Sequence, residues 1–207
     1  MILFSEKLCG LLKYRFVIAI FIFTIINYTN LFSQDLIFNG KDHKIGFQFG
    51  YGTQNLLEVD YHYDVYLFQV QYFYSLINEE TWSLEINIQP QFNFTSYKHI
   101  NFATSNESGY EYGLNFGIIA RKNILNDHLG VYILVGFGPH YTSGTPERQA
   151  NGFIFSDNFM FGINLKIINN IYCDLRTGLR HISNADLKEP NCGVNNFVIN
   201  SGFFFTF

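Results

Sequence analysis

Alternation of side-chain type with a period of two residues is the feature that most limits how this chain can fold. In the segment 44–51, large apolar side chains at Ile45, Phe47, Phe49 and Tyr51 alternate with polar residues or glycine. Successive side chains of a β-strand point to opposite faces, so this segment predicts a strand with one apolar face. The pattern recurs in seven further segments, namely 66–74, 82–89, 110–120, 129–141, 153–167, 171–183 and 195–207.

The lengths of the predicted connections indicate how the strands are arranged. They run to about 12, 5, 15, 7, 11, 3 and 11 residues, so long and short connections alternate. This alternation is typical of a transmembrane barrel with short periplasmic turns and longer extracellular loops. We therefore predict an all-β fold, an eight-stranded antiparallel transmembrane β-barrel of the outer membrane.

Composition agrees with a membrane barrel. Aromatic residues make up 19% of the chain and charged residues only 14%, against roughly 25% charged residues in an ordinary soluble protein. The alternating aromatics at the end of the chain, which finish with Phe207, resemble the C-terminal signature of outer-membrane barrels.

A secreted β-sandwich or a lipocalin-like barrel is the soluble alternative, and it would turn its apolar face inward. Here one face is almost continuously large and apolar. An eight-stranded lumen is only wide enough to be filled by side chains, so we expect the charges of the other face to pair inside it rather than line a pore. This other face carries Glu85, Asn115, Arg121, Lys166, Asp174, Arg176 and Arg180.

The second strand is the least certain of the eight. The sequence from Leu56 to Ser75 could hold a longer strand, with a bulge near Asp64 that shifts the alternation from one face to the other.

Residues 1–33 read as a signal peptide. Lys7, Lys13 and Arg15 precede the apolar run 16–26, and Ser33 offers a small residue at the cleavage position. The apolar run is well short of the roughly 20 residues that span a bilayer as a helix. We expect cleavage near Ser33 and a single barrel domain over residues 34–207.

Charge and cysteine content limit the partners. The formal net charge of −4 gives no indication of nucleic-acid binding. The six histidines are scattered, and no motif has the spacing of a metal site, so we predict no metal and no cofactor. Cys173 lies within a strand and Cys192 in the loop beyond its far end, too far apart for a disulfide.

Two polar residues break the apolar face of the seventh strand near its end. His181 and Ser183 share parity with Leu175 and Leu179, so both are predicted to face lipid, at the extracellular rim. Polar side chains that face hydrocarbon are costly and usually functional. Histidine is the usual base that activates a serine hydroxyl, and Asn195 of the last strand is expected to lie beside His181 on the same face.

The segment HISNADLKEPNCGVN resembles the active-site segment of the outer-membrane lipid A deacylases of the PagL type. The resemblance implies hydrolysis of the ester-linked acyl chain at position 3 of lipid A, the lipid of lipopolysaccharide in the outer leaflet, without metal or cofactor. It makes Ser183 the nucleophile, His181 the general base and Asn184 an oxyanion donor. Pro190, Asn191 and Gly193 would shape the loop.

The segment departs from the family at two positions. Asn195 stands where the family has the acidic residue of its triad, and Asp186 stands where it often has glycine. Three explanations follow: Asn195 orients His181 in a slower enzyme, Asp186 or Glu189 supplies the charge from the loop, or the site is inactive. In the last case the protein would be a non-catalytic barrel with an adhesive or membrane-stabilising role. A hydrolase of phospholipids is a further alternative.

Overall fold

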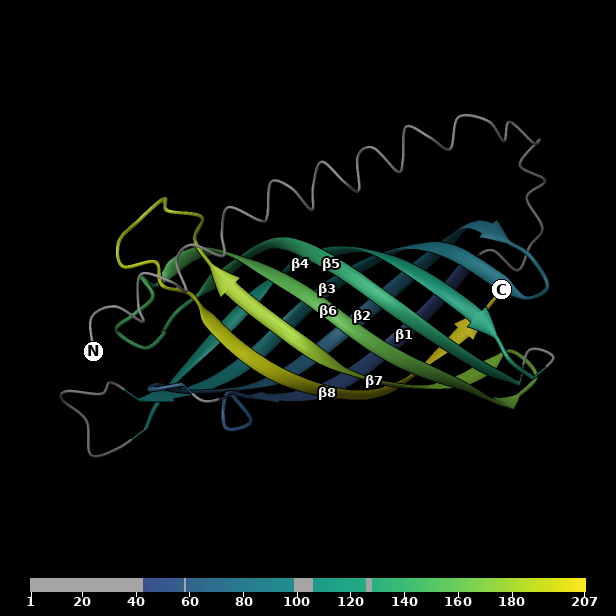
Figure 1. Ribbon diagram of the computed structural model, residues 1–207, viewed down its shortest axis with the longest axis horizontal. Coiled ribbons are helices and arrows are strands. Elements are labelled where there is room, and N and C mark those ends of the chain that lie inside the picture. The colour runs from purple at the N-terminus through teal and green to yellow at the C-terminus, as the bar shows by residue number, and fades with distance from the viewer. Residues whose placement is uncertain (1–42, 58, 99–105, 126–127) are drawn as a thin grey trace. The chain divides into compact units, whose positions relative to one another are not determined.

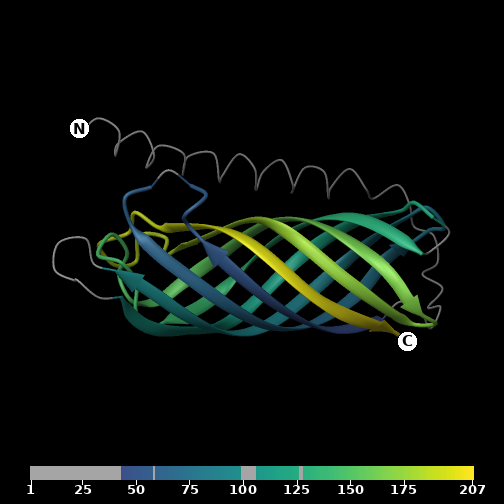
Figure 2. The same cartoon turned by 90° about the horizontal axis from the view of Figure 1, so that it is seen from below.

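The structure, a computed structural model, describes residues 43–57, 59–98, 106–125 and 128–207. The predicted signal peptide, residues 1–33, lies outside these residues. Each strand pairs antiparallel with the next, and β8 pairs with β1, so the sheet closes (Figures 1 and 2). The predicted eight-stranded barrel is therefore confirmed. The strands are β1 (His43–Thr53), β2 (His62–Asn78), β3 (Trp82–Lys98), β4 (Glu107–Asn123), β5 (Leu129–Thr142), β6 (Gly152–Ile168), β7 (Ile171–Ser183) and β8 (Val194–Thr206).

Long and short connections alternate as predicted. Figure 1 shows the connections after β5 and β7 at one end of the barrel and the turn after β6 at the other. Because short turns of outer-membrane barrels are periplasmic, the end that carries the loop 184–193 is extracellular. The long connections are 54–61, 99–106, 143–151 and 184–193, and the short ones are 79–81, 124–128 and 169–170.

The strands are longer than the alternation of apolar residues predicts. β2 begins at His62, β3 continues to Lys98 and β4 begins at Glu107. These extensions lie at the extracellular ends, where the outer face is no longer uniformly apolar, so hydrophobicity alone did not mark them. The loops that they flank are correspondingly shorter than predicted.

The second strand is indeed longer, but the bulge predicted near Asp64 is wrong. Pairing between β2 and β3 is in register through this position, and the register shifts instead between Ser75 and Ile77. The shift lies beside the turn 79–81, where only three residues connect the two strands. Asp64 therefore keeps the outward parity of the apolar row that follows it in β2.

The outer surface of the barrel is apolar. Exposed side chains alternate with buried ones along the strands, and the exposed ones are mostly aromatic or aliphatic, for example Phe49, Phe94 and Phe161. The inward side chains are largely polar, which is the reverse of a soluble barrel. This pattern, in a closed sheet, is that of a protein that spans the outer membrane.

Charges inside the lumen are paired, as predicted. At the periplasmic end, the Glu85 carboxylate accepts from Arg121 Nε and Nη2, at 2.8 and 3.0 Å, and from Lys44 Nζ at 2.7 Å. Toward the extracellular end, Arg180 Nη2 donates to Glu111 Oε2 at 2.5 Å. Two oppositely charged groups removed from water are favourable only when such hydrogen bonds satisfy them.

Neutral hydrogen bonds connect the remaining lumen groups. Asp174 accepts from Tyr132 Oη at 2.8 Å and from Asn164 Nδ2 at 2.6 Å. Arg176 Nη2 donates to Gln71 Oε1 at 2.6 Å. The middle of the barrel is therefore filled by side chains, which leaves no open pore through the described strands. Other predicted lumen residues also have partners, since Asn115 contacts His140 and Lys166 lies over the Tyr172 ring.

Within the part of the chain that the structure describes, no helix is long and apolar enough to cross a membrane. Cys173 and Cys192 are both free, as their spacing predicts.

Candidate active site

The extracellular end of β7 places His181 and Ser183 on the outer face. Along this strand, Arg180 and Ile182 point into the lumen and are 1% and 0% exposed, whereas Leu179 points outward and is 50% exposed. His181 and Ser183 have the parity of Leu179. His181 is half-buried, but Ser183 is only 2% exposed although it faces outward, so other protein atoms cover it. The predicted orientation of both residues is confirmed.

Asn195 lies directly beside His181. The two residues are register partners in the pairing of β7 with β8, and His181 Nδ1 lies 2.7 Å from Asn195 Oδ1. An amide oxygen only accepts hydrogen bonds, so this contact requires a hydrogen on Nδ1. The neutral imidazole then carries no hydrogen on Nε2, which is the form that can accept a proton.

Gly193 makes room for the imidazole of His181. Its φ of +67° lies in the left-handed region, which favours glycine. A Cβ atom at this position would lie 2.4 Å from His181 Cε1 and 3.0 Å from Nε2. The residue that the sequence identifies as loop-shaping therefore also fixes the space in which the ring lies.

Hydrogen bonds between side chains and backbone hold the loop 184–193 in one conformation. The Asn184 amide N–H donates to Asn191 Oδ1 at 2.8 Å, and Asn184 Nδ2 donates to the Lys188 carbonyl at 2.5 Å. Asn191 Nδ2 in turn donates to Asp186 Oδ1 at 2.7 Å. Asn184 and Asn191 are buried. The two asparagines thus order the loop immediately after Ser183.

The same loop is attached to the connection 143–151. Gln149 and Asn191 form an isolated antiparallel bridge. The bonds around this bridge are Ala150 N to the Pro190 carbonyl at 2.7 Å, Cys192 N to the Arg148 carbonyl at 2.9 Å and Gly193 N to Gln149 Oε1 at 3.2 Å. Two extracellular connections therefore form one unit beside Ser183 and His181.

Tyr61, in the connection 54–61, holds the backbone of Asn195. Its hydroxyl accepts from the Asn195 N–H at 2.7 Å and donates to the Asn195 carbonyl at 3.2 Å. Burial raises the pKa of the Tyr61 phenol above its ordinary value, so the hydroxyl keeps its proton at neutral pH. Arg148 lies over the Tyr61 ring at 4.6 Å and contacts Asp60. Sequence alone gave no signal for these partners, because they depend on how separate loops meet.

The two carboxylates considered as substitutes for the triad acid lie in the loop. Asp186 is exposed, has a φ of +64° and accepts from Asn191. Glu189 is exposed and precedes Pro190. Of the residues proposed for the acidic position, Asn195 is the one with a hydrogen bond to His181 in the structure.

One outward-facing carboxylate beside the site was missed by the sequence analysis. Asp157 of β6 is the register partner of His181 on the side opposite Asn195. Its parity is that of Phe155 and Phe159, so it interrupts an apolar row. The signal that identified His181, a polar residue on an apolar face, was present in this strand as well.

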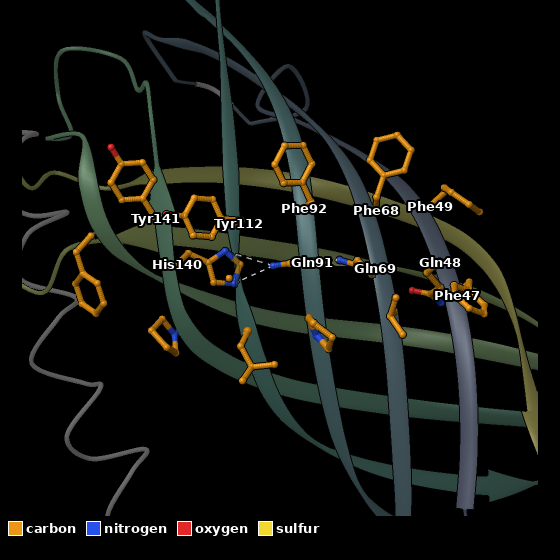
Figure 3. Close-up of a pocket in the computed structure, with 16 residues that line it drawn as sticks. Phe47, Gln48, Phe49, Phe68, Gln69, Gln91, Phe92, Tyr112, His140 and Tyr141 are labelled. Carbon is orange, nitrogen blue, oxygen red and sulfur yellow. Dashed lines mark hydrogen bonds between the residues drawn. The ribbon is translucent and has the colours of Figure 1, made fainter.

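The largest hollow of the wall lies elsewhere. It has a volume of about 760 Å³ and is lined by aromatic side chains such as Phe68, Phe92 and Tyr112, with Gln91 and His140 hydrogen-bonded beside them (Figure 3). The lining residues come from β1 to β6 and include none of the candidate site residues. Among the described residues, no group of histidine, cysteine, aspartate and glutamate side chains has the arrangement of a metal site.

The closed barrel, with its apolar outer face and polar lumen, defines an integral protein of the outer membrane. Residues 65–204 match the family described as "Lipid A 3-O-deacylase (PagL)". The chain belongs to this family. The match covers β7, the loop 184–193 and most of β8, which hold the candidate site.

Solved structures share the barrel fold. The outer membrane enzyme PagL is similar with a TM-score of 0.52 and 18% sequence identity, over 77% of this chain and 97% of that chain. The N-terminal β-barrel domain of Pseudomonas aeruginosa OprF has a TM-score of 0.41 and 10% identity, over 82% and 100%. Neisserial surface protein A has a TM-score of 0.44 and 11% identity, over 80% and 97%. No curated protein matches the chain.

Proposed function

We propose that this protein is a serine hydrolase of the outer leaflet that removes the 3-linked acyl chain of lipid A. The observation that carries the proposal is the hydrogen bond of 2.7 Å between His181 Nδ1 and Asn195 Oδ1, two residues before an outward-facing Ser183. Membership of the lipid A 3-O-deacylase family supplies the reaction and the substrate.

The reaction divides into two acyl transfers. Ser183 Oγ attacks the ester carbonyl carbon while His181 Nε2 accepts the hydroxyl proton. His181 then returns this proton to the sugar oxygen as the ester bond breaks, which leaves the acyl chain on Ser183. Water repeats the attack with His181 as base, releases the fatty acid and restores the serine hydroxyl.

Asn184 is the proposed oxyanion donor, together with a backbone N–H of the loop. One hydrogen of Asn184 Nδ2 is directed to the Lys188 carbonyl, so its second hydrogen is the one assigned to the developing oxyanion. Donors held rigidly by surrounding hydrogen bonds stabilise this charge without reorganisation. The bond from the Asn184 N–H to Asn191 provides part of this rigidity.

The lipid acyl chain is proposed to lie on the outer wall below the catalytic pair. Leu179 is the register partner of Phe159 in β6 and of Phe197 in β8, and these side chains form an apolar row one step toward the membrane centre. Such a surface needs no deep pocket, because the bilayer already holds the substrate. Equal activity on lipopolysaccharide and on short water-soluble esters would contradict this arrangement.

A non-catalytic barrel is the second candidate, and Asn195 is the observation that favours it. An amide orients the imidazole but cannot stabilise the imidazolium by charge. The two candidates differ in whether Ser183 has any role in chemistry.

Mass spectrometry of lipid A after incubation with the refolded barrel tests the proposal. We expect the wild type to release one hydroxyacyl chain and Ser183→Ala to release none. Ser201→Ala is the matched control, because Ser201 also faces outward but lies in β8 away from the site, beside Leu175. Intact lipid A after incubation with a folded wild-type barrel would favour the non-catalytic candidate. Loss of an acyl chain from phospholipids alone would indicate the other hydrolase.

A further inference from the structure

The candidate triad of this chain lacks a negative charge at its usual position. His181 becomes positively charged when it accepts the proton of Ser183, and Asn195 offers it only a neutral oxygen. A carboxylate near the ring would stabilise this cation. The inference below rests on the proposed hydrolase function and concerns the source of this charge.

Asp157 lies on the other side of His181 from Asn195. It belongs to β6, and its Cα pairs with that of His181, whose Cα pairs in turn with that of Asn195. Directly opposite residues of antiparallel strands have Cβ atoms about 5 Å apart on the same face. The three side chains therefore form one row across the outer surface, with His181 in the middle.

The surroundings of Asp157 make a charge expensive there. Its neighbours on the same face of β6 are Phe155 and Phe159, and its register partner in β5 is Phe137, which is 62% exposed. A carboxylate in an apolar wall at the membrane surface is usually retained for a function. For comparison, Asp64, another outward-facing carboxylate, lies 3.5 Å from His62 on its own strand.

The other charged groups around His181 are less well placed. From the loop, Asp186 accepts from Asn191, and Glu189 and Lys188 are exposed. From the β8 side, Asn195 intervenes between the ring and the Tyr61 hydroxyl. Arg148 and Asp60 lie beyond Tyr61 and contact each other.

We propose that Asp157 replaces the missing triad acid as the source of negative charge for His181. Asn195 keeps the role of fixing the tautomer and orientation of the ring. The proton moves only between Ser183 Oγ, His181 Nε2 and the leaving oxygen, and Asp157 remains ionised throughout. Asp157 is thus a positioning and charge-supplying residue that acts through His181, from the strand opposite the one that supplies the acid elsewhere in the family.

Exchange of the two side chains provides the test. We expect Asp157→Asn to lower kcat on lipopolysaccharide about 100-fold without a change in KM, because an opposite charge within about 6 Å stabilises the imidazolium by this order. The double variant Asp157→Asn with Asn195→Asp returns the carboxylate to the ring from β8, and we expect it to recover most of the lost kcat. Asp64→Asn removes an outward-facing carboxylate away from the site and should keep wild-type kcat.

The outcomes separate the inference from the proposed function. Wild-type kcat in Asp157→Asn, together with an inactive Ser183→Ala, would overturn the role of Asp157 and leave the hydrolase intact. A loss in Asp157→Asn that the double variant does not reverse, in a barrel with wild-type gel mobility and urea midpoint, would assign Asp157 a structural role and also overturn the inference. A wild type inactive on lipid A would refute the proposed function, and the role of Asp157 with it.

Discussion

The lumen and the outer wall beside β7 both contain polar clusters, but the clusters are built differently. In the lumen, Glu85 has two cationic partners within 3.0 Å, and Arg180 has Glu111. On the wall, His181 has a neutral partner, Asn195, and lies in a row that is otherwise apolar. Compensated charges stabilise a barrel, whereas uncompensated polar groups on a lipid-facing surface are the ones available for chemistry.

Removal of the base should produce the largest effect on the wall. We expect His181→Ala to lower kcat/KM on lipopolysaccharide by about 10⁴-fold, because Ser183 loses its proton acceptor. The urea midpoint of the barrel should stay within error of the wild type, measured by the fluorescence of the single tryptophan, Trp82. A large fall in stability would remove the distinction between the wall and the lumen.

Removal of a lumen charge should act in the opposite way. We expect Glu85→Gln to lower the free energy of unfolding by about 3 kcal/mol, because Arg121 and Lys44 are left with uncompensated charge. The remaining folded barrel should hydrolyse lipid A at the wild-type rate, since Glu85 lies at the periplasmic end. Urea titration and deacylation assays on the same preparation measure both quantities, and slower hydrolysis by fully folded protein would contradict the comparison.

A methyl group at position 193 should act on the wall alone. We expect Gly193→Ala to lower kcat about 30-fold, because the added Cβ would approach His181 Cε1 to 2.4 Å and displace the ring. The backbone strain at a φ of +67° should cost about 1 kcal/mol of stability. Gly152→Ala is the control, because Gly152 also has a positive φ, of +107°, but a Cβ there meets no atom within 4 Å. Equal activity of the two variants would show that the space beside His181 is not limiting.

Loss of the Tyr61 hydroxyl should have the smallest effect. We expect Tyr61→Phe to lower kcat about fivefold, because the Asn195 backbone loses two hydrogen bonds and holds the imidazole less firmly. The ring stays in place under Arg148, so packing is preserved. Initial rates of acyl-chain release measure the change, and a rate equal to that of the wild type would indicate that strand pairing alone fixes Asn195.

The alternation of side chains predicts the barrel, its orientation and the outward position of Ser183, because side-chain parity within a strand is local. Pairing between strands is not local. The register of β6 and β7 shifts between Lys166 and Ile168, beside the turn 169–170. Without this shift, Asp157 would pair with the inward-facing Ile182 rather than with His181. The partner of the catalytic base therefore could not be read from spacing in the sequence.

The contacts around the loop were also beyond prediction from the sequence. The resemblance identifies Asn184, Asn191 and Gly193 as important, but their hydrogen bonds join the loop to Gln149 in a connection more than thirty residues earlier. Tyr61 is further away still in the sequence, at a separation of 134 residues from Asn195. Such contacts depend on how three extracellular connections meet, which no periodic pattern records.

The central claim, that an outward-facing serine on a barrel wall is an acyl-transfer nucleophile, can be tested on the protein itself. The folded barrel in detergent is treated with a long-chain alkyl phosphonate ester, which forms a stable adduct with activated serines, and its peptides are analysed by tandem mass spectrometry. The account predicts one adduct, on Ser183, that is absent from His181→Ala. An unmodified Ser183 in the folded wild type, or equal labelling of Ser201, would contradict it.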